Sequence, residues 1–131
     1  MSIEIKASNA PHFPLPFSHA LRAGDFVYVS GQVGVDPETR ELVGDSIEAQ
    51  TIQSVRNIES ILQAAGLTLD HVIKVNAHLS CLSDSPAYNK AYETLFSKPY
   101  PTRTTVQSGL GNYLIEIDVI AYAPTRRGEI G

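Results

Sequence analysis

The sequence lacks several features on which familiar classes of protein depend. It has one cysteine, Cys81, so it forms no internal disulfide bond, and it has no Cys-x-x-Cys pair. No apolar run approaches the roughly 20 residues that a membrane-spanning helix needs. The N-terminal "MSIEIKASNAPHF" has no apolar core of the kind found in signal peptides. We therefore expect a cytoplasmic protein that does not enter a membrane.

An excess of positive charge is also missing. The 14 acidic residues outnumber the 10 basic ones, which gives a formal net charge of −4. A protein that binds nucleic acid usually carries a basic surface, so no nucleic-acid partner is expected. The composition, with 43% apolar and 18% charged residues, is that of an ordinary globular protein. A length of 131 residues fits a single domain, residues 1–131.

The common catalytic signatures are absent too. The four histidines, at positions 12, 19, 71 and 78, show no HxxxH or HExxH spacing, so no metal site is expected. The segment "GLGNY" at 109–113 leads into a predicted strand rather than a helix, unlike a phosphate-binding loop. There is no GxSxG nucleophile motif. Cys81 has no obvious base nearby, which favours an inert thiol.

Two helices are expected. In the first, over residues 45–66, Asp45 and Glu48 have the spacing of a capping box, and Gly66 is the expected end. Its apolar residues recur at helical spacing: Ile47, Thr51, Val55, Ile58, Leu62 and Ala65. The second runs from a cap at Ser85 to about Phe96.

Strands are expected around these helices. The proline-rich first segment is predicted to be irregular, followed by strands at 18–22 and 26–30 and a short third strand after "VDPET". In "HVIKVNAHL", one face holds Ile73, Val75, Ala77 and Leu79. "TRTTVQS" and "YLIEIDVIAYA" complete the order β-β-β-α-β-α-β-β, an α+β fold with two helices on one face of a mixed sheet. Apolar residues on both sides of 26–29 suggest that partner subunits cover the other face.

An arginine inside the strand "PYPTRTTVQ" needs an explanation. Arg103 keeps its charge when buried, and its planar fork fits a carboxylate with two parallel hydrogen bonds. Spacing alone favours a salt bridge to Glu116 or Asp118 on the following strand. The alternative is a clamp for the carboxylate of a ligand.

Other polar positions also leave two interpretations. Glu116, inside the apolar "LIEIDV", is either solvent-facing or a carboxylate that handles water or a proton. "SGQ", Ser30 to Gln32, is either a strand exit or a backbone that approaches a ligand closely at Gly31. Asn89 is usually no more than a polar residue on a helix surface.

Taken together and in this order, several segments resemble the Rid family of reactive-intermediate deaminases, also called the YjgF family. They are "AGDFVYVSGQVGVDPET", "AQTIQSVRNIESILQAAGLTLDHVIKVNAHLSCL", "YNKAYETLF" and "PTRTTV" with "IEI". The resemblance implies a chorismate-mutase-like fold, a homotrimer with ligand clefts between subunits, and no metal or organic cofactor. It also implies hydrolysis of small imines and enamines, such as 2-aminoacrylate, to 2-oxo acids and ammonia.

The resemblance also assigns roles to residues. Arg103 corresponds to the arginine that binds the substrate carboxylate, and Glu116 to the glutamate that positions or activates water. The other pocket positions are Ser30, Gly31, Asn89 and Thr105, the last in place of a cysteine whose backbone contacts the ligand. Phe17 replaces a tyrosine near the active site, so a phenolic hydroxyl is lost.

Phe17 and a shortened loop between Arg103 and Glu116 suggest a branch distinct from the archetype. Three alternatives to simple imine hydrolysis therefore stay open. They are a pathway-specific enamine deaminase acting on 2-aminomuconate, a module that binds a small carboxylate without turnover, and a ribonuclease or translation inhibitor, which the acidic charge disfavours.

Overall fold

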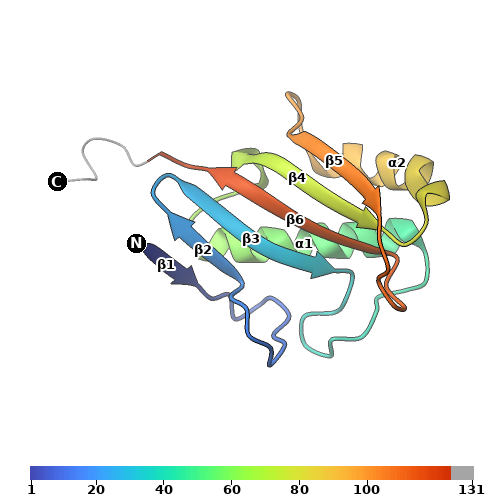
Figure 1. The fold of residues 1–131 in the computed structure, drawn as a ribbon, viewed down its shortest axis with the longest axis horizontal. Coiled ribbons are helices and arrows are strands. Elements are labelled where there is room, and N and C mark those ends of the chain that lie inside the picture. The colour runs from blue at the N-terminus through green and yellow to red at the C-terminus, as the bar shows by residue number, and fades with distance from the viewer. Residues whose placement is uncertain (125–131) are drawn as a thin grey trace.

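The structure, a computed structural model, describes residues 1–124 and contains one six-stranded sheet with two helices behind it (Figure 1). In chain order the elements are β1 Ser2–Ile5, β2 Ala20–Ala23, β3 Phe26–Val33, α1 Ile47–Ala64, β4 Val72–Leu79, α2 Ser85–Leu95, β5 Thr102–Gln107 and β6 Ile115–Tyr122. The strand order in the sheet is β1-β2-β3-β6-β4-β5, and only β4 and β5 run parallel. The expected α+β fold and element order are confirmed.

The first three strands, however, are not the ones expected. The segment after "VDPET" makes only an isolated bridge, Val35 with Leu42, and is not a strand. The additional strand is β1, in the stretch predicted to be irregular, and it pairs antiparallel with β2 with Ile5 beside Ala20. A short strand of this kind is stabilised by its neighbour, and the local sequence pattern does not reveal such a distant partner.

The helix boundaries follow local chemistry. Ser46, not the predicted Asp45, caps α1, because its side-chain oxygen accepts a hydrogen bond from the Ala49 N–H at 3.1 Å. Gly66 follows the end of α1 with a φ of +76°, a conformation that glycine adopts without strain. Helix α2 begins at Ser85, with Asp84 at the cap position.

The core lies between the helices and one face of the sheet. Ile58, Ile61 and Leu62 of α1 are fully buried, as are alternating apolar residues of β4 and β6. The predicted inward face of β4 is wrong at Ile73, which is 42% exposed. The pairing of β4 with β6 is irregular between Val72 and Lys74, so Val72 takes the buried position instead.

The other face of the sheet is open. Four large apolar side chains lie on it with 39–47% of their surface exposed: Leu21, Tyr28, Val106 and Tyr122. The rings of Phe26 and Tyr122 are neighbours there, with centroids 5.2 Å apart. Neither helix of the described chain, residues 1–124, is both long and apolar enough to cross a membrane.

Candidate functional site

Arg103 and Glu116 lie on opposite faces of the sheet. β4 lies between β5 and β6, so the two residues are on strands that are not adjacent. Arg103 is aligned with Val75, whose side chain is buried beneath the helices. Glu116 is aligned with His78, and His78 alternates with core residues along β4. Because side chains alternate along a strand, Arg103 points to the helix side and Glu116 to the open side.

This geometry rules out the salt bridge that spacing alone favoured. Asp118, two residues from Glu116, also points to the open face, where it accepts a hydrogen bond of 2.9 Å from Asn76 Nδ2. Within residues 1–124, Arg103 forms no ion pair, so its charge is available to a ligand or to a partner chain.

Two tyrosine rings of α2 hold the Arg103 guanidinium. Its central carbon lies 4.7 Å from the centroid of the Tyr92 ring and 5.2 Å from that of Tyr88. Such cation–π contacts stabilise a guanidinium while leaving its N–H groups free to bind an acceptor. Arg103 borders a hollow of about 430 Å³, here called the Arg103 hollow, whose other lining residues are Asn89, Tyr92, Glu93, Tyr100 and Pro101.

Hydroxyl groups without a well-formed hydrogen bond lie behind this arginine. The side-chain oxygens of Tyr88, Tyr92 and Thr105 are buried and form no hydrogen bond of good geometry, although Tyr88 lies near both Thr105 and Arg103. Burial raises the pKa of Tyr88 and raises that of Tyr92 to about 12, although the charge of Arg103 opposes both shifts. Both tyrosines are therefore neutral near pH 7 and act as rings and hydrogen-bond donors, not as bases.

On the open face, Glu116 lies directly against Gly31. A Cβ atom built on Gly31 would be 2.6 Å from Glu116 Oε2, so only glycine leaves room for this carboxylate. The pairing of β3 with β6 shifts here, since Val29 is aligned with Val119 but Gln32 with Ile117. Ser30 and Gly31 thus form a β-bulge, a local widening that commonly occurs next to functional sites.

A second hollow, of about 400 Å³, opens in front of this carboxylate. We call it the Glu116 hollow, and its lining residues are Phe13, Leu15, Phe17, Ser30, Gly31, Val33, Tyr113 and Glu116. The Ser30 hydroxyl donates a hydrogen bond of 2.6 Å to the Ser18 carbonyl, which fixes the entry to the bulge.

The structure therefore divides the predicted site residues into two groups. Phe17, Ser30, Gly31 and Glu116 meet in the Glu116 hollow. Arg103 and Asn89 meet in the Arg103 hollow. Thr105 lines neither hollow, but it follows Arg103 by two residues on the same side of β5.

Sequence reasoning missed several residues of both hollows. Tyr88 and Tyr92 of α2 were not singled out from the sequence as residues of a site. Their spacing of one helical turn was the available signal, because residues four apart share a helix face. Phe13, Leu15 and Tyr113 come from loops, and no periodic pattern marks them.

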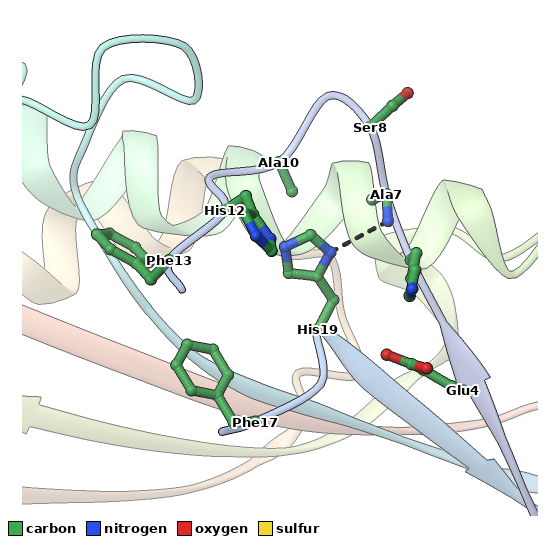
Figure 2. Close-up of a pocket in the computed structure, with 9 residues that line it drawn as sticks. Glu4, Ala7, Ser8, Ala10, His12, Phe13, Phe17 and His19 are labelled. Atoms are coloured by element: carbon green, nitrogen blue, oxygen red, sulfur yellow. Dashed lines mark hydrogen bonds between the residues drawn. The ribbon is translucent and has the colours of Figure 1, made fainter. Parts of the chain in front are cut away.

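A third hollow, of about 460 Å³, adjoins the second and shares Phe13 and Phe17 with it (Figure 2). Its central side chain is His19, whose Nδ1 accepts a hydrogen bond of 3.1 Å from the Ala7 N–H. Nε2 therefore carries the proton and donates to the Pro11 carbonyl at 2.8 Å. His19, which directly precedes β2, thus fastens the N-terminal segment to the start of that strand.

The other histidine, cysteine and acidic residues of the described chain form no third candidate site of this kind. Within residues 1–124, no three His, Cys, Asp or Glu side chains come close enough together to hold a metal ion. His78, beside Glu116 in the sheet, has its Nδ1 2.8 Å from the Ser108 Oγ. Cys81 is exposed, and its Sγ lies 2.9 Å from the Ser83 Oγ.

Comparison with known proteins gives a consistent result. A family model described as Endoribonuclease L-PSP matches residues 7–123. A RutC family protein of Saccharolobus solfataricus is 44% identical over 108 residues, 81% of this chain and 86% of the relative. The 2-iminobutanoate/2-iminopropanoate deaminase of Dermatophagoides farinae is 35% identical over 91 residues, 70% of this chain and 71% of the relative. The crystal structure of RidA from Psychrobacter sp. superposes with a TM-score of 0.87 at 39% identity, covering 92% of this chain and 98% of RidA.

Proposed function

The chain belongs to the Rid family, also called the YjgF or L-PSP family, and we propose that it hydrolyses imines or enamines that carry a carboxylate, releasing 2-oxo acids and ammonia. One observation carries this proposal. Arg103 is held on two tyrosine rings at the edge of a hollow and has no acidic partner within residues 1–124. A guanidinium held in this way suits the carboxylate of a small substrate.

The proposed reaction needs few protein groups. Arg103 fixes the carboxylate and so orients the C=N bond. Water adds to the imine carbon while Glu116 takes a proton from it and the nitrogen gains a proton. The amino group of the resulting carbinolamine gains a further proton, its C–N bond breaks, and ammonia leaves with both electrons of that bond. The oxygen loses its proton to form the carbonyl group. An enamine enters the same sequence after a proton adds to its carbon.

A small substrate cannot reach Arg103 and Glu116 of the same chain, because the sheet lies between them. The proposed site therefore forms between two copies, with the Arg103 hollow of one facing the Glu116 hollow of the other. The homotrimer implied by the family resemblance would bring them together. The exposed apolar side chains of the open face support this arrangement, because a partner subunit would bury them.

A coupled assay tests the activity. An amino-acid oxidase generates 2-imino acids, and semicarbazide traps whatever imine survives. We expect the wild type to lower semicarbazone formation, and Arg103→Ala and Glu116→Gln to lose on the order of 100-fold or more of that effect. An unchanged semicarbazone yield with wild type and every imine tested would refute the proposal. Ligand binding without turnover would then point to the module that only binds a carboxylate.

A mixing experiment tests the division of the site between copies. Arg103→Ala and Glu116→Gln chains are co-expressed with different tags, and mixed oligomers are purified. Each variant alone should be inactive, but every purified mixed trimer should regain about a third of its sites, the one in which both residues are intact. If mixed oligomers stay as inactive as the parents, the two residues do not serve one site across an interface.

A further inference from the structure

The hydroxyl of Tyr88 is not explained by the contact of its ring with Arg103. Tyr88 is fully buried, and the Arg103 guanidinium carbon lies 5.2 Å from the centroid of its ring. The hydroxyl lies near the side chains of both Thr105 and Arg103, but it forms no hydrogen bond of good geometry with either. A buried hydroxyl in this state destabilises a fold, so its presence calls for an explanation.

The sheet places Thr105 and Arg103 on the same side, toward α2. In β4, Val75 is aligned with Arg103 and Ala77 with Thr105, and both of these β4 side chains are buried beneath the helices. The Oγ1 atom of Thr105 is itself buried and forms no hydrogen bond of good geometry. The two β5 side chains and the Tyr88 hydroxyl therefore form one polar cluster behind the Arg103 hollow.

Donor and acceptor chemistry favours one order of hydrogen bonds in this cluster. A guanidinium can only donate, so the Tyr88 oxygen has to accept from an N–H group of Arg103. The Tyr88 hydroxyl then has its own proton left to donate, and Thr105 Oγ1 is the acceptor beside it. Donation to Thr105 turns the lone pairs of the Tyr88 oxygen toward the guanidinium.

We propose that Tyr88 is a positioning residue for the carboxylate clamp: its hydroxyl, oriented by Thr105, accepts a hydrogen bond from Arg103 and so fixes the direction in which the remaining N–H groups point. This inference rests on the proposed function and names a further residue of the same site. The hydrogen bond becomes well aligned when a carboxylate binds, because hydrogen bonds at active sites are often loose in the free enzyme and tighten in the complex.

Tyr88→Phe tests the inference, because it removes the hydroxyl and keeps the ring. We expect the KM for the imine to rise about 10-fold, the usual size for a hydrogen bond to a charged group. The kcat should be almost unchanged, because the substrate and the transition state lose the same interaction. A KM equal to that of the wild type overturns the inference.

Thr51→Val is the matched control for the loss of a buried hydroxyl. Thr51 lies on α1, its Oγ1 is buried and also lacks a hydrogen bond of good geometry, and it lines none of the three hollows. This variant should keep the wild-type KM, whatever its effect on the urea midpoint. If it raises the KM as much as Tyr88→Phe does, the hydroxyl of Tyr88 has no specific role.

Substitutions of Thr105 test whether it acts through Tyr88. Thr105→Val should raise the KM, and Thr105→Ser, which keeps a hydroxyl, should recover most of that loss. The double variant Tyr88→Phe/Thr105→Val should have no higher KM than Tyr88→Phe alone, because the two residues serve one interaction. Two rises that simply add would overturn the link between them.

Calorimetry with pyruvate, a 2-oxo acid with the same carboxylate, separates this inference from the proposed function. If the wild type binds pyruvate without hydrolysing imines, and Tyr88→Phe weakens this binding about 10-fold, the positioning role stands and the deaminase activity is removed. If imines are hydrolysed and Tyr88→Phe matches the wild type, the activity stands and the positioning role is removed. If the wild type neither hydrolyses imines nor binds pyruvate, both proposals fail.

Discussion

The two faces of the sheet differ in how their side chains are packed. The face under α1 and α2 is closed, and its side chains are mostly apolar and buried, with Arg103 on the edge strand β5 as the exposed exception. The open face mixes exposed apolar residues with polar ones, and on it Glu116 of β6 lies beside the β3 bulge. We therefore expect substitutions on the closed face to lower the stability of the protein, and substitutions on the open face to lower its activity.

Two glycines three residues apart on one segment show this difference. At Gly34 an added Cβ would lie 2.5 Å from the Gln50 Cα, which is backbone of α1. At Gly31 it would meet only side-chain atoms, Oε2, Cδ and Cγ of Glu116, so the carboxylate rather than a backbone would have to move. One glycine lets a helix approach the sheet, and the other makes room for a carboxylate.

The largest effect is expected from a substitution on the closed face, and it is a loss of stability. Gly34→Ala forces α1 away from β3, because a helix backbone cannot move locally, and should lower the free energy of unfolding by about 3 kcal/mol. Urea unfolding measures this loss. Gly44→Ala is the control, because its added Cβ would make an ordinary contact of 3.6 Å with Ala49. Equal unfolding midpoints for the two variants would contradict this account of Gly34.

On the open face we expect a loss of activity instead. Gly31→Ala displaces the Glu116 carboxylate and should lower imine hydrolysis by roughly 10- to 100-fold, because a small misplacement of a reacting group is costly. Its urea midpoint should stay close to that of the wild type. A variant as unstable as Gly34→Ala, or one with full activity, would show that the two glycines do not differ in this way.

The smallest effect is expected from changes to the tyrosine rings beneath Arg103, and it is a rise in the KM for the imine. Tyr92→Leu removes a ring that lies 4.7 Å from the guanidinium and should raise the KM for the imine by roughly 3- to 10-fold, the usual range for a cation–π contact. Tyr92→Phe keeps the ring and should restore most of the binding.

Phe96→Leu separates this contact from general damage to the core. Phe96 stacks on Tyr92 with centroids 4.6 Å apart, whereas the rings that hold the Arg103 guanidinium are those of Tyr88 and Tyr92. The Phe96→Leu variant should be less stable than the wild type, without a matching rise in the KM for the imine. If Tyr92→Phe behaves like Tyr92→Leu, the hydroxyl rather than the ring serves the arginine.

Much of the closed face could be predicted from the sequence, because packing imposes a period. The spacing from Ile47 to Leu62 predicted the buried side of α1, and alternation in β4 predicted the inward residues Val75, Ala77 and Leu79. Ile73 was misplaced because an irregularity in pairing shifts the alternation, and only the partner strand reveals it. β1 was missed because its stability comes from β2, which lies well apart in sequence.

The open face and the site were harder to predict. Arg103 was given a partner on the following strand, but the next strand in sequence is not the next in the sheet. β5 pairs with β4, so β6 is one strand further away and Glu116 points to the other side. The residue types of the site were recognisable one by one, whereas their division between two hollows depends on the three-dimensional arrangement.

The bulge at Ser30 and Gly31 also determines which residues of β3 face the helices. Before it, the odd-numbered residues Val27 and Val29 face the helices, and after it the even-numbered Gln32 does, while Val33 is aligned with Glu116. Removing one residue here would restore regular alternation and leave both Val29 and Gln32 on the helix side, because the two bulge residues lie opposite a single residue of β6. The packing of the strand therefore does not need the additional residue. What would be lost is the backbone position without a side chain, Gly31, that leaves room for the Glu116 carboxylate.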